Sequence, residues 1–196
     1  MDFQHEQSWD NLTTILASRI TAADAWNKFI DFHEQVVPKS YWNLLRQLDI
    51  EAEQMEIVAW LQQLVNDNPI PKGIVAFWIG LVKFADDDKE IPTIYIAGAD
   101  VYDKDDIDWA CEPTYLPEHR YVQPEGLQQI DYVVSTDKEN YEFCDWILPI
   151  AYCAFIFDEI IRTKLDKKLF LKNKNKIFVS IGYDSGDYIA LTPIKG

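Results

Sequence analysis

The chemistry that this chain can offer is concentrated in an acidic segment between Asp86 and Glu112. The segment carries ten acidic and two basic residues, which gives a local charge of −8. Crowded carboxylates repel one another and do not help a chain to fold, so the cluster is easier to explain if a basic partner or a cation binds there. The candidate partner contacts among these acids are Asp100, Asp103, Asp105, Asp106, Asp108 and Glu112.

Aromatic residues and an arginine lie among these acids and directly after them. Because Trp, Tyr and Arg dominate the energetics of protein interfaces, Trp109, Tyr115 and Arg120 join the candidate partner-binding residues. The acids would steer a basic protein to this surface, and the rings would anchor it once bound. The alternative is that Trp109 and Tyr115 are core residues that cover a sheet.

A metal site is the second chemistry that the acids could support. Asp103 and Asp105 have the spacing that begins an EF-hand calcium loop. That loop also needs Gly at its sixth position and Glu at its twelfth, where this chain has Asp108 and Thr114. None of the three histidines is paired at the spacing of zinc ligands. We therefore predict no metal site and no cofactor.

A nucleophilic dyad is the third possibility, because Cys111 and His119 lie in the same proline-containing loop. Dyads are assembled in space rather than along the sequence, and a small packing role for Cys111 is the alternative. The chain has no G-x-S-x-G motif and no phosphate-binding glycine pattern. We assign no catalytic residue, and a small hydrolase-like enzyme with a cleft under loop 102–124 stays as an alternative function.

The charge is uneven along the chain. The whole protein has a formal net charge of −15, whereas residues 162–196 carry eight bases and three acids. An acidic body repels nucleic acid and anionic lipid and attracts basic proteins in a salt-dependent way. We read the lysines of 162–176 as cations at a helix C-terminus and in a solvated connection, or as internal partners of the acidic segment. We expect no nucleic-acid partner.

The cysteines and the apolar runs indicate a cytoplasmic protein. The three cysteines form no C-x-x-C pair, which argues against a disulfide framework and fits a reducing compartment. The first ten residues lack the basic and apolar regions of a signal peptide. The longest apolar run, residues 146–157, is shorter than the roughly 20 residues that span a bilayer, so we expect no membrane association.

Helical periodicity covers the first 70 residues and returns near the C-terminus. Apolar residues at spacings of three and four predict a helix from Thr21 to Pro38, with Thr21 and Asp24 as a capping pair. Other helices are expected at 8–19, 40–48, 51–66 and 125–133. The longest is expected at 139–168, where Pro149 delays or kinks it.

Four segments rich in β-branched and aromatic residues predict strands. Residues 74–84 and 91–101 form one hairpin around 86–90, and residues 177–183 and 188–192 form another around 184–187. The sequence therefore predicts a single α+β domain over residues 1–196, with a helical part (1–70) and a sheet plus long helix (71–196). The sheet is expected to be antiparallel, with about four strands packed on the long C-terminal helix.

The run WACEPTYLPEHRY, from Trp109 to Tyr121, follows a strand that ends YIAGAD at Asp100. This pattern resembles small uncharacterised bacterial proteins and is similar in character to polymorphic-toxin immunity proteins. The resemblance covers residues 95–121. It implies an acidic, cytosolic, one-domain protein without enzymatic activity, which neutralises a toxin by covering it, and it brings no catalytic residue.

The leading hypothesis is a non-enzymatic intracellular binding protein, an immunity-type inhibitor that occludes a basic toxin domain through the acidic, aromatic loop. The enzyme with a cleft under loop 102–124 is one alternative. The other is a self-associating structural or regulatory module, which would expose an apolar patch and form a dimer. The oligomeric state does not follow from the sequence.

Overall fold

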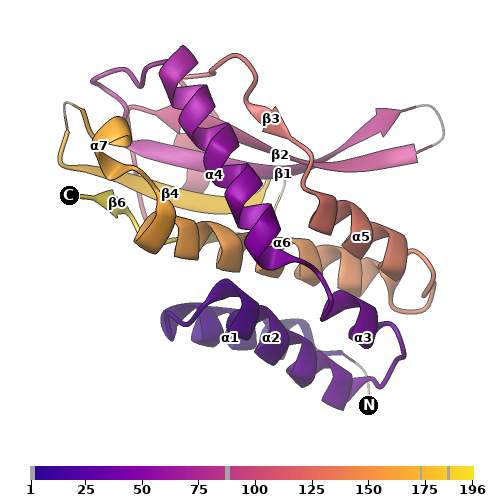
Figure 1. Cartoon of the computed structure of the whole chain (residues 1–196). Coiled ribbons are helices and arrows are strands. Elements are labelled where there is room, and N and C mark those ends of the chain that lie inside the picture. The colour runs from indigo at the N-terminus through magenta and orange to yellow at the C-terminus, as the bar shows by residue number, and fades with distance from the viewer. Residues whose placement is uncertain (1–2, 87–88, 173, 185) are drawn as a thin grey trace.

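The computed structural model describes residues 3–86, 89–172, 174–184 and 186–196. Its elements lie in three layers, with α1 (His5–Ala17) and α2 (Ala22–Val36) outermost, α6 (Tyr141–Glu159) in the middle and a β-sheet beyond it (Figure 1). The predicted cap of α2 is present, since the Thr21 hydroxyl accepts a hydrogen bond from the backbone N–H of Asp24 at 3.1 Å.

The remaining helices connect and cover these layers. Helix α3 (Trp42–Leu45) leads into α4 (Ile50–Asp67), which crosses one face of the sheet next to α6. Helix α5 (Glu125–Val134) packs against α6. The long helix predicted at 139–168 is shorter than expected, because α6 passes into a π-helical turn, η2 (Ile160–Lys164), and the chain then forms a separate short helix, α7 (Lys167–Phe170).

The strands form one mixed sheet in the order β3-β2-β1-β4-β5, with β6 paired to β4. Strand β1 is antiparallel to β2 and parallel to β4, and β4 is antiparallel to β5 and β6. The strands are β1 (Ala76–Asp86), β2 (Lys89–Ala99), β3 (Tyr121–Val122), β4 (Lys176–Tyr183), β5 (Tyr188–Ala190) and β6 (Ile194–Lys195).

The prediction of a four-stranded antiparallel sheet is thus only partly right. The two hairpins form, but the structure joins them through the parallel pair β1/β4 and adds the short strands β3 and β6. A parallel pair needs a long crossover, and the segment with α5, α6 and α7 supplies it. The predicted turns at 86–90 and 184–187 include residues 87, 88 and 185, which lie outside the described residues.

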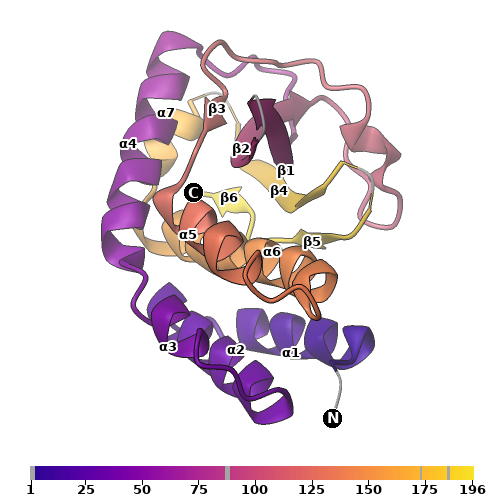
Figure 2. The ribbon, with the colours of Figure 1, turned by 90° about the vertical axis from the view of Figure 1, so that its right-hand side faces the viewer.

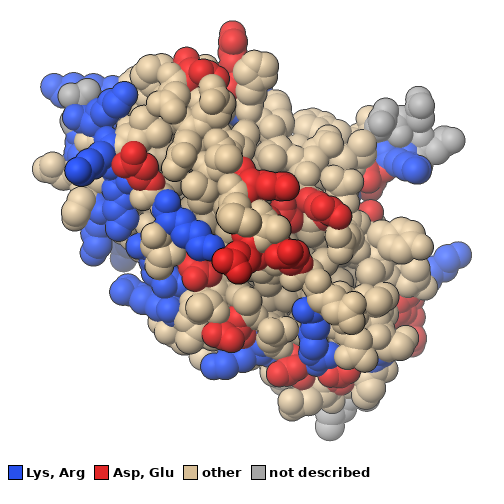
Figure 3. Space-filling view, in the orientation of Figure 1, with Lys and Arg blue, Asp and Glu red and all other residues tan. Residues whose placement is uncertain are grey.

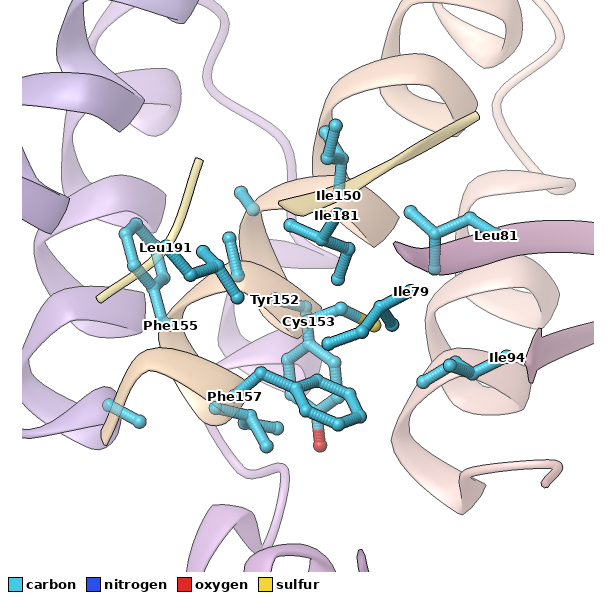
Figure 4. Close-up of a cluster of buried hydrophobic side chains, with 14 of the residues drawn as sticks. Ile79, Leu81, Ile94, Ile150, Tyr152, Cys153, Phe155, Phe157, Ile181 and Leu191 are labelled. Carbon is cyan, nitrogen blue, oxygen red and sulfur yellow. The ribbon is translucent and has the colours of Figure 1, made fainter. Parts of the chain in front are cut away.

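The main core lies between α6 and the sheet (Figure 4). Alternate residues of each strand point to the same face of a sheet, so apolar side chains of the strands meet those of α6 there. The buried side chains of this cluster include Ile79, Leu81, Ile94 and Ile181 from the strands and Ile150, Cys153 and Phe157 from α6. Helix α6 is buried nearly all round because α1 and α2 cover its other side.

The opposite face of the sheet is covered differently. In Figure 2 the coil between β2 and β3, which carries the short 3-10 helix η1 (Ile107–Ala110), lies on the other side of the sheet from α4. The side chains on this face include those of Ala76, Trp78 and Ala99, and they form a second buried cluster with Trp109. We call this side of the sheet the coil-covered face.

None of the described helices has the length and apolar character that crossing a bilayer requires.

Candidate partner-binding face

Trp109 is a core residue and not an exposed anchor. Its side chain is only 6% exposed, and its ring meets that of Trp78 edge-on at 6.3 Å between centroids. Tyr102 contacts the same indole and stacks on Phe178 of β4 at 4.0 Å. These rings fasten the acidic segment to the sheet. In the unbound protein the Trp109 ring packs on the sheet and holds the acidic segment there. The expectation that Trp109 is an exposed anchor for a partner is therefore corrected.

Tyr115 is also buried, because it connects the coil to strand β2 and to the end of α4. The backbone N–H of Gly98 donates to the carbonyl of Tyr115 at 2.8 Å, and a Cβ on Gly98 would lie 2.9 Å from the Tyr115 ring. The Tyr115 hydroxyl donates to the carbonyl of Asn68, and burial raises its pKa to about 12. Tyr115 thus joins the coil to the end of α4, and it is not available to a partner in this conformation.

The six acids proposed as partner contacts, in contrast, face the solvent. All six candidate carboxylates, from Asp100 to Glu112, are on exposed residues. Within the described part of the chain they form a single ion pair, between Lys104 Nζ and Asp105 Oδ2 at 3.6 Å, and both side chains of that pair are more than three-quarters exposed. These six carboxylates therefore keep nearly all of their negative charge available.

Two of the acids also shape the backbone of the segment. Asp103 Oδ1 accepts a hydrogen bond from the N–H of Asp105 at 2.9 Å, and Asp106 Oδ1 accepts one from the N–H of Asp108 at 2.9 Å. Such Asx turns let a short polar side chain replace a backbone acceptor. They explain why the segment takes a defined shape despite the repulsion between its charges.

Partly exposed aromatic rings lie further along the coil-covered face. Tyr121 of β3 is 44% exposed and Phe84 of β1 is 42% exposed, and their ring centroids are 5.2 Å apart. The ring of Tyr95 lies 5.8 Å from that of Tyr121. None of these three residues is among the partner contacts predicted from the sequence. The alternate positions of Phe84 in β1 and of Tyr95 in β2 were the available signal for those two, but only the pairing of β2 with β3 brings Tyr121 beside Tyr95.

A carboxylate outside the acidic segment completes this ring cluster. Asp184 Oδ1 accepts hydrogen bonds from the Tyr95 hydroxyl and, at 3.3 Å, from the indole N–H of Trp78. Burial, and then the charge and hydrogen bond of Asp184, raise the pKa of Tyr95. The acceptor comes from the turn after β4, far from the rings in sequence.

Gly80 makes room for this arrangement. A Cβ at position 80 would lie 2.0 Å from Cε1 of Tyr95, so only glycine lets the Tyr95 ring lie across β1. The ring then reaches Asp184 on the far side of the strand.

Arg120 sits at the edge of the ring cluster. Its guanidinium lies 4.7 Å from the centroid of the Tyr121 ring, and its Nη2 donates to the Tyr121 hydroxyl at 3.2 Å. A cation over an aromatic face is attracted by the ring quadrupole. Arg120, one of the predicted partner-binding residues, therefore lies beside exposed aromatic surface, and its contact with a partner stays a prediction.

The C-terminal lysines make their own contacts elsewhere in the structure. Lys and Arg side chains gather around α7 at the left of Figure 3. Lys174 donates to the carbonyls of Pro71 and Ile74 at 2.8 and 2.7 Å, and burial lowers its pKa. Lys176 lies 3.7 Å from the centroid of the Phe178 ring. Among the described residues, none of these lysines forms an ion pair with the segment.

The residues considered for catalysis and metal binding form neither kind of site within the described part of the chain. Cys111 and His119 are both exposed, and the His119 carbonyl accepts a hydrogen bond from the indole N–H of Trp60 at 3.1 Å. His33, which lies in the helical part, is a fully buried core residue. Within the described residues, no three His, Cys, Asp or Glu side chains gather as ligands of a metal ion.

The arrangement can thus attract a cationic surface and offer it aromatic contacts. Comparison with models of known protein families, with curated proteins and with solved structures finds no match for this chain.

Proposed function

We propose that the protein is a non-enzymatic intracellular binding protein, and that its partner is a basic protein domain which docks on the acidic segment and the neighbouring rings of the coil-covered face. The observation that carries the proposal is that the six carboxylates from Asp100 to Glu112 are exposed and form one ion pair within the described part of the chain. A surface that retains its charge in the folded protein can attract a cationic partner over about 10 Å at 0.1 M salt.

The anchoring role in this proposal passes to the exposed rings. Phe84 and Tyr121 expose about two-fifths of their surface, and Arg120 lies beside Tyr121. Aromatic and arginine side chains that become fully buried on binding supply most of the energy of an interface. The acids would then act mainly on the association rate and on the choice of partner.

The biological role that fits this surface is that of an immunity-type inhibitor. Such a protein needs no catalytic group, since it acts by covering the active surface of a basic toxin. The support for this role is the charge of the face together with the motif-level resemblance of residues 95–121, and the partner's identity is the part that the experiment must supply.

The experiment is affinity capture at rising salt with two variants of equal charge. In the test variant, Asp103, Asp105, Asp106 and Asp108 are each changed to Asn. This variant removes four charges from the segment but keeps the side-chain oxygens that accept from the N–H groups of Asp105 and Asp108. In the control variant, four exposed acids elsewhere are changed to their amides, at Asp10, Glu56, Glu139 and Glu142.

We expect wild type and the control variant to retain the same basic protein at low salt and to release it as salt rises. The test variant should retain at most about a tenth as much, because electrostatic steering changes association rates by at least tenfold. Recovery of no basic protein, or equal recovery with the test variant, contradicts the proposal.

A further inference from the structure

A second feature that could bind a ligand lies on the helix side of the sheet. A cavity of about 210 Å³ opens between the β1–β2 hairpin and the helices α5 and α6. Its apolar walls are formed by Leu81, Pro92, Leu127 and Pro149. Protein interiors contain few voids larger than a water molecule, and an apolar cavity of about 150 Å³ can take up benzene. This cavity has room for one aromatic ring with a short substituent.

The polar wall of the cavity is a lysine held by three acceptors. Lys83 Nζ lies 2.6 Å from Asp131 Oδ1, 2.7 Å from Asp145 Oδ1 and 3.1 Å from the Tyr141 hydroxyl. An ammonium group has three N–H donors, so all the donors of Lys83 are used inside the protein. Lys83 therefore has no hydrogen bond left to give to an anionic ligand.

The charge of this wall is negative. Asp131 and Asp145 face one ammonium group, which leaves a formal charge of −1, and each carboxylate is only 25% exposed. In the described part of the chain, the Oδ2 atoms of both residues accept no hydrogen bond from another residue. A partly buried carboxylate forms a stronger hydrogen bond with a charged donor than with a neutral one. An anion would be repelled by this wall.

We propose that this cavity binds a small organic cation, namely a primary ammonium group on an aromatic ring or on an apolar group of similar size. The ring lies among Leu81, Leu127 and Pro149, and the ammonium donates to the free oxygens of Asp131 and Asp145. The site is on the opposite face of the sheet from the acidic segment, so it does not depend on the proposed function.

The test is an NMR titration of the isotopically labelled full chain with benzylamine at pH 7. Benzyl alcohol keeps the ring without the charge, and methylammonium keeps the charge without the ring. We expect saturable shifts around Leu127 for benzylamine and about tenfold weaker binding of each comparison compound, since hydrogen bonds to charged groups are the stronger ones. The absence of saturation, or equal binding of benzyl alcohol, overturns the proposal.

Matched variants locate the bound cation. Asp145→Asn should weaken benzylamine binding by about tenfold and leave benzyl alcohol binding unchanged. Glu142→Gln removes the same charge from an exposed position of the same helix and should have no effect. Asp131→Asn is the second variant and should act like Asp145→Asn. If Glu142→Gln weakens binding as much as they do, the cation does not bind in the cavity and the proposal is wrong.

Discussion

His33 connects the stability of this protein to pH through one buried side chain. It is fully buried, and its ring nitrogens lie 2.8 Å from the carbonyl of Phe29 and 3.0 Å from the hydroxyl of Ser8. Burial disfavours the imidazolium form and lowers the pKa of His33 to about 4. An unfolded chain would protonate this group near pH 6.5, so between these two values the unfolded state binds the extra proton.

The pH dependence should follow from that difference. As pH falls from about 6.5 to about 4, His33 should cost the folded state about 3 kcal/mol of unfolding free energy. His33→Gln keeps polar contacts without a titrating group, so its stability should fall less over the same range. Urea unfolding of both proteins at a series of pH values measures this difference. Parallel pH profiles would show that His33 does not titrate as described.

A second residue-scale prediction concerns the packing of Tyr95 on Gly80. Gly80→Ala places a methyl group where the Tyr95 ring lies, so the ring must leave its position above β1 and its contact with Asp184. We expect a loss of about 1–3 kcal/mol in unfolding free energy, as for other overpacked sites. Gly73→Ala is the control, because nothing lies within 4 Å of a Cβ there. Equal stability of the two variants would contradict this packing.

At the scale of elements, a residue of strand β4 replaces the hydrogen bond that Pro149 removes from helix α6. Proline has no N–H, so the carbonyl of Asp145 loses its usual partner four residues on. The hydroxyl of Tyr183, at the end of β4, lies 3.2 Å from that carbonyl and 2.8 Å from the carbonyl of Trp146. Helix α6 and strand β4 are thereby tied together at the point where the helix would otherwise be weakest.

A double-mutant cycle tests this tie. Tyr183→Phe should lower the unfolding free energy by about 1–2 kcal/mol, because it leaves the partly buried carbonyl of Asp145 without a donor. In a Pro149→Ala background the same change should cost less, since the alanine N–H can now donate to the carbonyl of Asp145. Chemical denaturation of the four proteins gives the coupling energy. A coupling of zero would mean that Tyr183 acts independently of Pro149.

At the scale of the whole molecule, charge is unevenly distributed over the surface. The chain carries −15 overall, with exposed acids on the segment and lysines around α7. Like charges held together destabilise the compact state, and salt screens them. The free protein therefore bears a cost that a cationic partner would remove.

This distribution predicts opposite effects on stability and binding. Changing Asp103, Asp105, Asp106 and Asp108 to Asn should leave the unfolding free energy of the free protein unchanged or raise it by up to about 1 kcal/mol. The gain should shrink as salt is added. Thermal unfolding of the variant and of wild type at low and high salt measures the difference. A clear loss of stability would indicate that these carboxylates serve the fold.

The sequence by itself determined most of the elements and the charge of the candidate face. The helical spacing after Thr21 and the β-rich runs around 74–101 and 177–192 depend on neighbouring residues, so local periodicity is enough to find them. The acidic segment is likewise a property of consecutive residues, and its exposure follows because carboxylates are costly to bury.

Only the tertiary structure decided what those elements become together. The parallel pairing of β1 with β4 depends on a crossover of many residues, which no local pattern encodes. The same long-range packing buries Trp109, brings Tyr95 and Tyr121 together on one face of the sheet, and forms the cavity next to Lys83. Whether a residue is buried depends on partners that are distant in sequence. A tryptophan can serve as an exposed anchor or as a core residue, so the sequence left both roles open for Trp109. The packing of the coil on the sheet makes it a core residue.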